Sequence, residues 1–93
     1  MVHMLAVTVF GKYEENVKRL ALNLAGVVKS HRVLGPSKGT IGKINDVYRY
    51  VFYVKNPDYD RLVEIKDLLE KWLVERQPKW ESVQFDFNPM NSI

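Results

Sequence analysis

Hydrophobic positions follow a period of two in several segments of the chain, which is the pattern of β-strands with one buried face. Leu5–Phe10 and Val83–Phe87 alternate in this way, and Val47–Lys55 is a longer run of β-branched and aromatic residues. These three segments predict strands. His31–Leu34 predicts a fourth, shorter strand that ends at Gly35-Pro36, because this residue pair is a strong turn signal.

Two other segments carry apolar residues three and four positions apart, which is the spacing of one helix face. The first helix is expected between Tyr13 and Val28. The second is expected to end near Arg76, after a turn that offers Asp58 or Asp60 as the N-cap residue.

The predicted elements follow one another in the order β-α-β-β-α-β. Right-handed crossovers then place both helices on one face of a four-stranded antiparallel sheet. The sequence therefore predicts an α+β, ferredoxin-like fold whose second sheet face is open.

Alternation also sorts the side chains of the third strand between the two faces of the sheet. Arg49, Val51, Tyr53 and Lys55 share the side with charged ends, which we expect to face solvent. The other side carries Tyr48, Tyr50, Phe52 and Val54, which then face the helices unless a bulge exchanges the two sets. Asp86 of the last strand is expected on the open face, so a salt bridge to Asp86 is an alternative role for Arg49.

Positive charge is concentrated in the middle of the chain. Of the formal net charge of +3, residues 29–55 carry +5 and the remainder carries −2. A basic segment on a nearly neutral body is typical of proteins that bind a polyanion. Lysines that are merely solvated in a surface hairpin are the simpler alternative.

Length and composition indicate a single domain. The chain has 93 residues, 46% of them hydrophobic and 27% charged, as in an ordinary globular domain. We expect residues 1–4 to be a cloning remnant, residues 5–90 to form the domain and residues 91–93 to be a tail. Without cysteine, a signal peptide or an apolar run of about 20 residues, a cytoplasmic protein is expected.

The glycine-rich stretch from Gly35 to Lys43 fails as a nucleotide-binding loop. A Walker A motif ending in Gly42-Lys43 requires glycine at position 37 and a hydroxyl residue at position 44, where this chain has Ser37 and Ile44. Neither of the two histidines has a partner at metal-binding spacing, and we expect no catalytic residue and no metal site in this segment.

An aromatic-rich third strand on a ferredoxin-like sheet also invites comparison with RNA-recognition motifs. Those motifs carry K/R-G-F/Y-G/A-F-V-x-F/Y on this strand, whereas Tyr48–Val54 lacks the glycine. What remains is a glycine-rich hairpin whose backbone can follow a sugar-phosphate chain, with lysine and arginine to supply charge.

Five short segments, taken in order, resemble one known family over nearly the whole chain. They are Arg32–Pro36, Ile41–Ile44, Tyr48–Tyr50, Lys55 and Phe85–Pro89. Together they are similar to the C-terminal domain of primosomal protein N′ (PriA), the bacterial replication-restart helicase. The family has a V-L-G-P segment, a Y-R-W or Y-R-Y start to a strand that ends in lysine, and a closing strand similar to I-D-V-D-P.

The chain departs from this family pattern in three places. Its hairpin has Ser37, Gly39 and Thr40 where the family is richer in proline and alanine. Val47 replaces a basic residue, and Asn88 replaces an aspartate.

The resemblance implies a module of a larger DNA helicase, which helps it to bind branched, fork-like DNA without sequence specificity. The parent family uses ATP and magnesium and carries zinc on cysteines, but these belong to parts that this segment lacks, so no cofactor is expected here. The implied partners are branched or single-stranded DNA, the rest of the helicase chain and the acidic tail of single-stranded DNA-binding protein. The implied location is the bacterial cytoplasm.

Six residues are the candidates for DNA contact, five for phosphates and one for stacking on an unpaired base. They are Lys38, Lys43, Arg49, Arg32 and Lys55 for phosphates, and Tyr53 for the base. Three other functions stay open: a protein-docking module, a ribosome-like RNA-binding domain, and a small-molecule sensor.

Overall fold

The computed structural model of the chain describes residues 2–44 and 47–89, with side chains described for residues 2–39 and 47–89. Four strands and two helices follow one another in the predicted order within these ranges. They are β1 (His3–Gly11), α1 (Glu14–Val27), β2 (Arg32–Ile44), β3 (Val47–Asn56), α2 (Tyr59–Arg76) and β4 (Glu81–Phe87).

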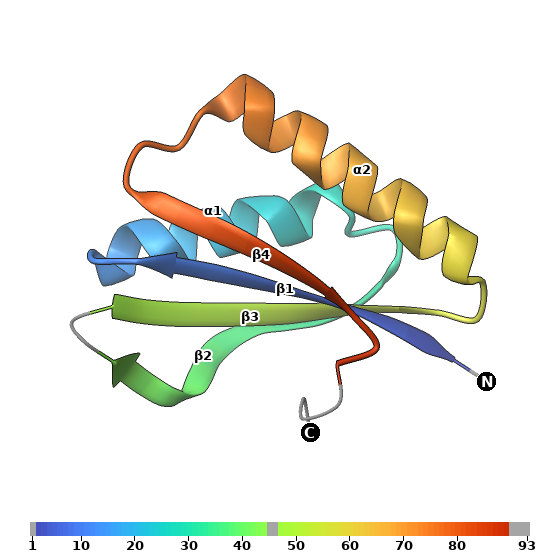
Figure 1. Cartoon of the computed structure of the whole chain (residues 1–93), viewed down its shortest axis with the longest axis horizontal. Coiled ribbons are helices and arrows are strands. Elements are labelled where there is room, and N and C mark those ends of the chain that lie inside the picture. Colours follow the sequence, from blue (N-terminus) through green and yellow to red (C-terminus); the bar gives the residue numbers. More distant parts are fainter. Residues whose placement is uncertain (1, 45–46, 90–93) are drawn as a thin grey trace.

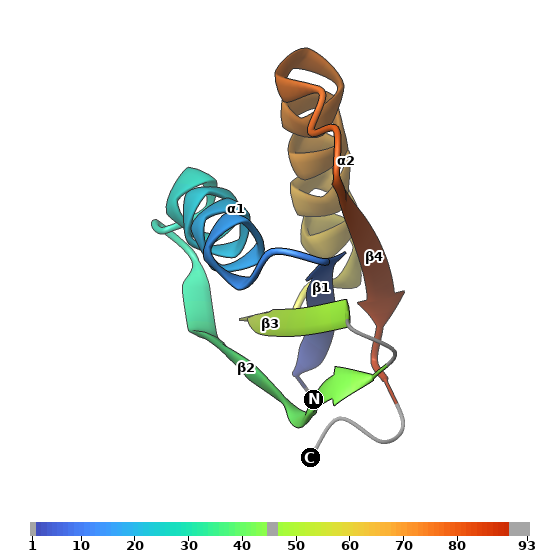
Figure 2. The same cartoon turned by 90° about the vertical axis from the view of Figure 1, so that its left-hand side faces the viewer.

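The strands form one antiparallel sheet in the order β2-β3-β1-β4 (Figure 1). Both helices lie on the same side of this twisted sheet, and the other side is left open (Figure 2). The predicted α+β, ferredoxin-like arrangement is thus confirmed. β1 begins at His3, two residues before the predicted start of the strand, and His3 pairs with Asn56 of β3.

A single apolar core lies between the sheet and the helices. Its largest fully buried side chain is Phe52 of β3, and the helices contribute apolar residues at the predicted spacing of three and four. Each fully buried large side chain stabilises the fold by about 1.5–3 kcal/mol. The largest fully buried side chains are Phe52, Leu5, Leu24, Leu62, Leu69, Val7, Val9, Val17, Val28 and Val54.

The ends of α2 are stabilised by local polar contacts. Asp58 is the N-cap residue, and its side chain accepts a hydrogen bond of 3.0 Å from the backbone N–H of Asp60. This satisfies one of the N–H groups that a helix leaves unpaired at its start. At the other end Gln77 adopts the left-handed conformation, with its N–H donating to the carbonyl of Leu73.

The strand that was predicted to end at Gly35-Pro36 continues instead as far as Ile44. Leu34 pairs with Tyr53 and Ser37 pairs with Val51, so three steps along β2 oppose two steps along β3. One extra residue is therefore accommodated in β2 as a bulge.

Gly35 makes this bulge possible. Its φ of +97° lies in a region that side chains of L-residues rarely adopt, and a Cβ there would lie 3.0 Å from the carbonyl oxygen of Val51. The Gly-Pro pair thus shifts the register inside a strand and does not end it.

A second register shift follows between Lys38, which pairs with Tyr50, and Lys43, which pairs with Tyr48. The glycine-rich stretch, which was predicted to be part of a hairpin, is therefore an irregular part of β2, and β2 pairs with β3.

Candidate nucleic-acid interface

The sheet face away from the helices, called the open face below, carries four of the six predicted contact residues. Arg49, Tyr53 and Lys55 of β3 alternate with the buried Tyr50, Phe52 and Val54, as the alternation predicted. Arg32 of β2 pairs with Lys55 and lies on the same face. The three residues of β3 cover most of the length of that strand, and Arg32 lies beside one end of it, on β2.

Arg32 and Lys55 are direct neighbours across the β2–β3 pair. Like charges that face each other across two strands destabilise a sheet. Among the residues whose side chains the structure describes, no acidic group forms an ion pair with either of them. This end of the open face therefore has two positive charges with no internal counterion in the described structure.

Arg49 marks the other end of the open face. It pairs with Phe10 of β1, and its guanidinium carbon lies 5.9 Å from the centre of the Phe10 ring, as in a cation–π contact. The ring therefore helps to orient the guanidinium group, a role for which the sequence pattern offered no signal.

The alternative role for Arg49, a salt bridge to Asp86, is excluded by the sheet order. β1 lies between β3 and β4, and Asp86 pairs with Ala6, four positions along β1 from Phe10. Four positions correspond to about 13 Å along a strand, in addition to the two strand spacings across the sheet.

Between these two ends the described open-face residues of β2 and β3 are uncharged, and the acidic Asp86 lies two strands away from Tyr53, on β4. Tyr53 is half-buried, and its pairing partners are Leu34 on one side and Ala6 on the other. Leu34 is 44% exposed although it is apolar. An aromatic ring beside an exposed apolar side chain, with cations at both ends, provides a surface on which bases and phosphates can both be held.

Lys38 lies on the other face of the sheet from these residues. The bulge at Gly35 brings Lys38 opposite Tyr50, so its side chain points to the side of α1. There its Nζ lies 3.2 Å from Oε2 of Glu14, and 5.5 Å from the centre of the Tyr48 ring. Lys38 is thus already paired with a carboxylate, and it is not part of the open face.

Glu14 links Lys38 to the core. The buried Tyr50 donates its hydroxyl hydrogen to the same Oε2 atom at 2.9 Å. The hydrogen bond from Tyr50, followed by the contact with Lys38, lowers the pKa of the Glu14 carboxyl. The same hydrogen bond, together with burial, raises the pKa of the Tyr50 hydroxyl.

The side chain of Lys43, the sixth predicted residue, lies outside the described residues, and only its backbone pairing with Tyr48 is described. Tyr48 and Tyr50 themselves pack with the core, as predicted.

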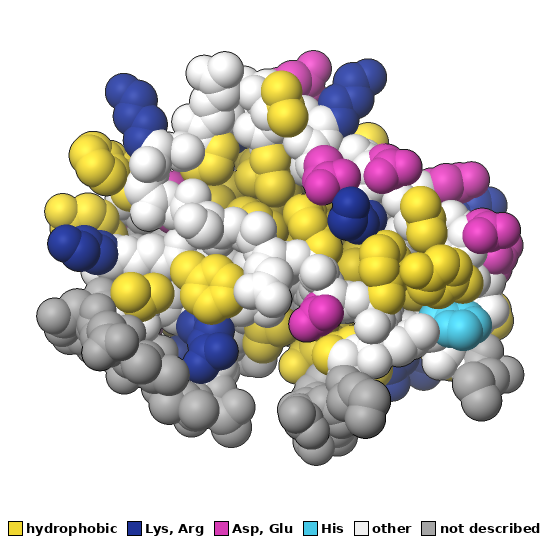
Figure 3. Space-filling model, viewed as in Figure 1, with side chains coloured by type: hydrophobic (Ala, Val, Ile, Leu, Met, Phe, Trp, Pro, Cys, Tyr) yellow, Lys and Arg dark blue, Asp and Glu magenta, His cyan; other side chains and the backbone are white. Residues whose placement is uncertain are grey.

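Acidic side chains gather along α2 (Figure 3), which lies on the helix-covered side of the sheet, away from the open face (Figure 2). Two basic residues of this helix are paired with them: Arg61 with Glu64 at 3.2 Å, and Lys66 with Glu70 at 3.0 Å. Their spacings of i,i+3 and i,i+4 are those at which opposite charges meet on the surface of a helix. These pairs leave α2 as a poor surface for a polyanion.

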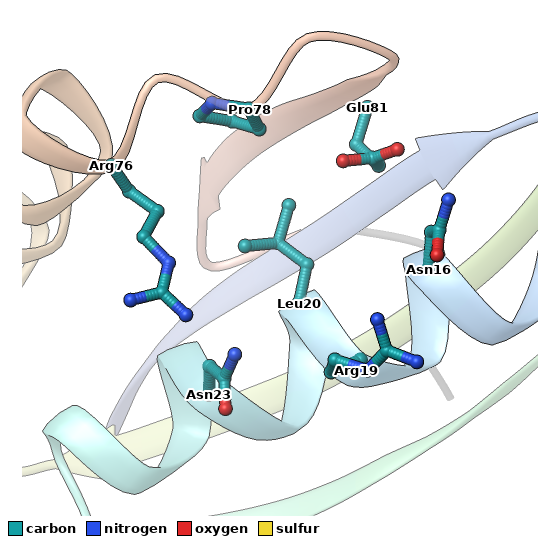
Figure 4. A pocket seen from close by; sticks show the side chains of 7 residues that line it. All are labelled: Asn16, Arg19, Leu20, Asn23, Arg76, Pro78 and Glu81. Carbon is teal, nitrogen blue, oxygen red and sulfur yellow. The ribbon is translucent and has the colours of Figure 1, made fainter.

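A groove that the sequence did not predict lies between α1 and the C-terminal end of α2 (Figure 4). Its volume is about 230 Å³, Leu20 points into it from α1, and Arg19 and Arg76 approach it from the two helices. Asn16, Asn23, Pro78 and Glu81 complete the lining. No periodicity in the sequence indicates that Arg19 and Arg76, from different helices, share one groove.

Within residues 2–44 and 47–89, no group of three or more His, Asp or Glu side chains is placed to hold a metal ion. Neither of the helices in the same ranges is long and apolar enough to cross a membrane.

Comparison with solved structures shows the same fold in proteins of different kinds. A de novo designed protein, Foldit4, matches with a TM-score of 0.71 and 15% identity over 98% of this chain and 100% of its own. The YXEP protein of Bacillus subtilis, a dinuclear metal-binding peptidase of the M20 family, matches with a TM-score of 0.54 and 12% identity. A hydantoinase/carbamoylase family amidase from Burkholderia ambifaria matches with a TM-score of 0.53 and 13% identity.

The last two matches cover 95% and 92% of this chain but only 26% and 27% of the two enzymes, so the chain spans about a quarter of their length. At these identities the likeness concerns the fold alone.

Comparison with curated protein sequences finds no match. Comparison with models of protein families, in contrast, matches residues 1–90 to the primosomal protein N C-terminal domain. The resemblance seen in the sequence is confirmed: the chain belongs to the primosomal protein N C-terminal domain family, whose members are components of the replication-restart primosome.

Proposed function

We propose that this domain binds branched or single-stranded DNA without sequence specificity through its open face, and that it contributes binding and not catalysis to a replication-restart helicase of the bacterial cytoplasm. The contacts would be made by Arg32, Arg49 and Lys55 to phosphates, and by Tyr53 to an unpaired base. The observation that carries the proposal is the direct opposition of Arg32 and Lys55 on two paired strands.

The opposition of two cations costs stability unless an anion lies close to both. No carboxylate among the described side chains fills that role, and the phosphate backbone of DNA carries negative charge at short, regular intervals. A phosphate between Arg32 and Lys55 would turn mutual repulsion into two charge-assisted contacts.

The length of the open face suits several nucleotides. Arg49 and Lys55 are six positions apart on β3, which is about 20 Å at 3.4 Å per residue. The rise along one strand of B-form DNA is also about 3.4 Å per nucleotide, so the two ends are about six nucleotides apart. Tyr53 and Leu34 lie between them, where bases would meet apolar surface.

The test is a titration of fluorescently labelled forked, duplex and single-stranded DNA with this chain, followed by anisotropy at several salt concentrations. Three phosphate contacts predict a slope of about −2.7 for log K against log salt on duplex DNA. Between 50 and 200 mM salt, this slope corresponds to a loss of affinity of about 40-fold. Arg49→Gln is expected to bring the slope to about −1.8.

Lys38→Gln is the matched control, because it removes one positive charge on the other face, from a side chain already paired with Glu14. An unchanged slope for Lys38→Gln, together with the reduced slope for Arg49→Gln, would support the open face. A reduced slope for Lys38→Gln with an unchanged slope for Arg49→Gln would assign binding to the glycine-rich hairpin. Lys43→Gln would then test the other predicted contact of that hairpin. Tighter binding of structured RNA than of forked DNA would contradict the proposal.

Docking of a protein segment is the second candidate function, and the groove between α1 and α2 favours it. Arg19 and Arg76 flank an apolar floor at Leu20, which fits a peptide with both acidic and apolar residues. Such a peptide would match the acidic tail of single-stranded DNA-binding protein implied by the family resemblance. In the same titration, DNA binding that is absent even at low salt would leave this docking function as the better account.

A further inference from the structure

Two lysine–aromatic pairs lie at the end of the sheet where β1 ends and β4 begins. Lys12-Tyr13 follows β1 directly, and Lys79-Trp80 directly precedes β4. The register brings the two segments together, because Gly11 pairs with Glu81. A Cβ on Gly11 would lie only 3.6 Å from the carbonyl oxygen of Trp80.

Both aromatic side chains are unusually exposed. Tyr13 is 58% exposed and Trp80 is 70% exposed, whereas Trp72 is half-buried beside the guanidinium group of Arg76. Neither Tyr13 nor Trp80 makes a ring contact or a side-chain hydrogen bond with any other residue that the structure describes. Their apolar surface therefore contributes little to the stability of the fold.

Both lysines are exposed as well, and neither forms an ion pair within the described part of the chain. Of the neighbouring acidic residues, Glu14 is held by Tyr50 and Lys38, and Glu81 lines the groove beside α1. Glu15 remains exposed on α1. In Figure 3, hydrophobic and basic side chains lie side by side at the left-hand edge, where β1 ends and β4 begins.

We propose that Tyr13 and Trp80 form a stacking site for unpaired bases of single-stranded DNA, with Lys12 and Lys79 on the adjacent phosphates. Exposed aromatic rings next to cations are the usual platform for single-stranded nucleic acid, because every base has a face that can stack. The site shares its class of ligand with the proposed function, but it uses a different surface and different residues.

The chemistry of the four residues selects this ligand over an apolar protein partner. A docking surface for a protein core would surround the rings with apolar residues, whereas here each ring lies between a lysine and a glutamate in the chain. Glu14 is held by Tyr50 and Lys38, and Glu81 lines the groove beside α1. The end of the open face at Arg49 and Phe10 is adjacent, since Phe10 pairs with Ser82 in the same β1–β4 ladder. A single strand of DNA that leaves the open face at this end would reach Tyr13 and Trp80.

The first measurement uses Trp72→Phe, which leaves Trp80 as the single tryptophan, because the chain has two. Addition of oligo(dT) is expected to quench the fluorescence of Trp80, and added salt is expected to reverse the quenching. Binding of labelled oligo(dT) measured by anisotropy is expected to weaken about five-fold or more in Trp80→Ala and in Tyr13→Ala. Lys12→Gln and Lys79→Gln are each expected to reduce the salt slope by about 0.7.

Val74→Ala is the matched control, because Val74 is an apolar side chain on α2 that is 71% exposed. It is expected to bind oligo(dT) as the unmodified chain does. Far-ultraviolet circular dichroism checks that each variant is folded.

The outcomes separate this site from the open face. Unquenched Trp80 and unchanged affinity in Trp80→Ala would overturn the stacking site, and a weakened Arg49→Gln variant in the same assay would leave the proposed function standing. Quenching of Trp80 with no effect of Arg49→Gln would support the stacking site and overturn the role of the open face.

Discussion

Replacement of Gly35 by alanine tests the bulge that determines which face of β2 each side chain occupies. The φ of +97° is costly for any residue with a Cβ, and the new methyl group would lie 3.0 Å from the carbonyl oxygen of Val51 and 3.2 Å from the backbone nitrogen of Ser37. A residue held in so sparsely populated a conformation costs about 1–3 kcal/mol. We therefore expect Gly35→Ala to lower the free energy of unfolding by about 2 kcal/mol.

The assay is urea unfolding followed by circular dichroism, with a thermal scan beside it. For a domain of this size, about 2 kcal/mol corresponds to a fall in Tm of roughly 8–16 °C. Gly26→Ala is the matched control, because it lies in α1, its φ is not positive and nothing lies within 4 Å of its added Cβ. It is expected to stabilise the domain by about 0.5 kcal/mol. A Gly35→Ala variant as stable as the unmodified chain would refute the reasoning.

Two further predictions concern polar contacts of the helices. The stability contribution of Glu14, whose pKa is lowered, is present above its ordinary pKa of 4.5 and is lost as the pH falls through the pKa of the folded state. The stability contribution of Tyr50, whose pKa is raised, is present below its ordinary pKa of 10.0 and is lost as the pH rises through the pKa of the folded state. Urea midpoints measured against pH should show both losses of stability. Tyr50→Phe should remove the loss at alkaline pH and reduce the loss at acidic pH. Unchanged losses in this variant would contradict the assignment. Asp58→Ala removes the N-cap of α2 and is expected to cost about 1 kcal/mol in urea unfolding, with Asp58→Asn close to the unmodified chain; equal stability of all three would mean that the cap contributes nothing.

The sequence alone determined the order of the elements, the two faces of β3 and the family. These are local properties: alternation assigns Tyr53 and Lys55 to one face and Phe52 to the other, and a period of 3.6 marks the buried stripe of each helix. The cap at Asp58 and the ion pairs along α2 could be predicted for the same reason, since each joins residues at most four positions apart.

Tertiary structure decided which of these residues meet. One extra residue at Gly35 moves Lys38 from the open face to the side of α1, where it meets Glu14, because a shift of one residue exchanges the faces of a strand. The sheet order places β1 between Arg49 and Asp86, and the β1–β4 register brings Tyr13 close to Trp80 across more than sixty residues of chain. Neighbours of this kind depend on pairing between distant strands, and a periodicity read within one segment carries no information about that pairing.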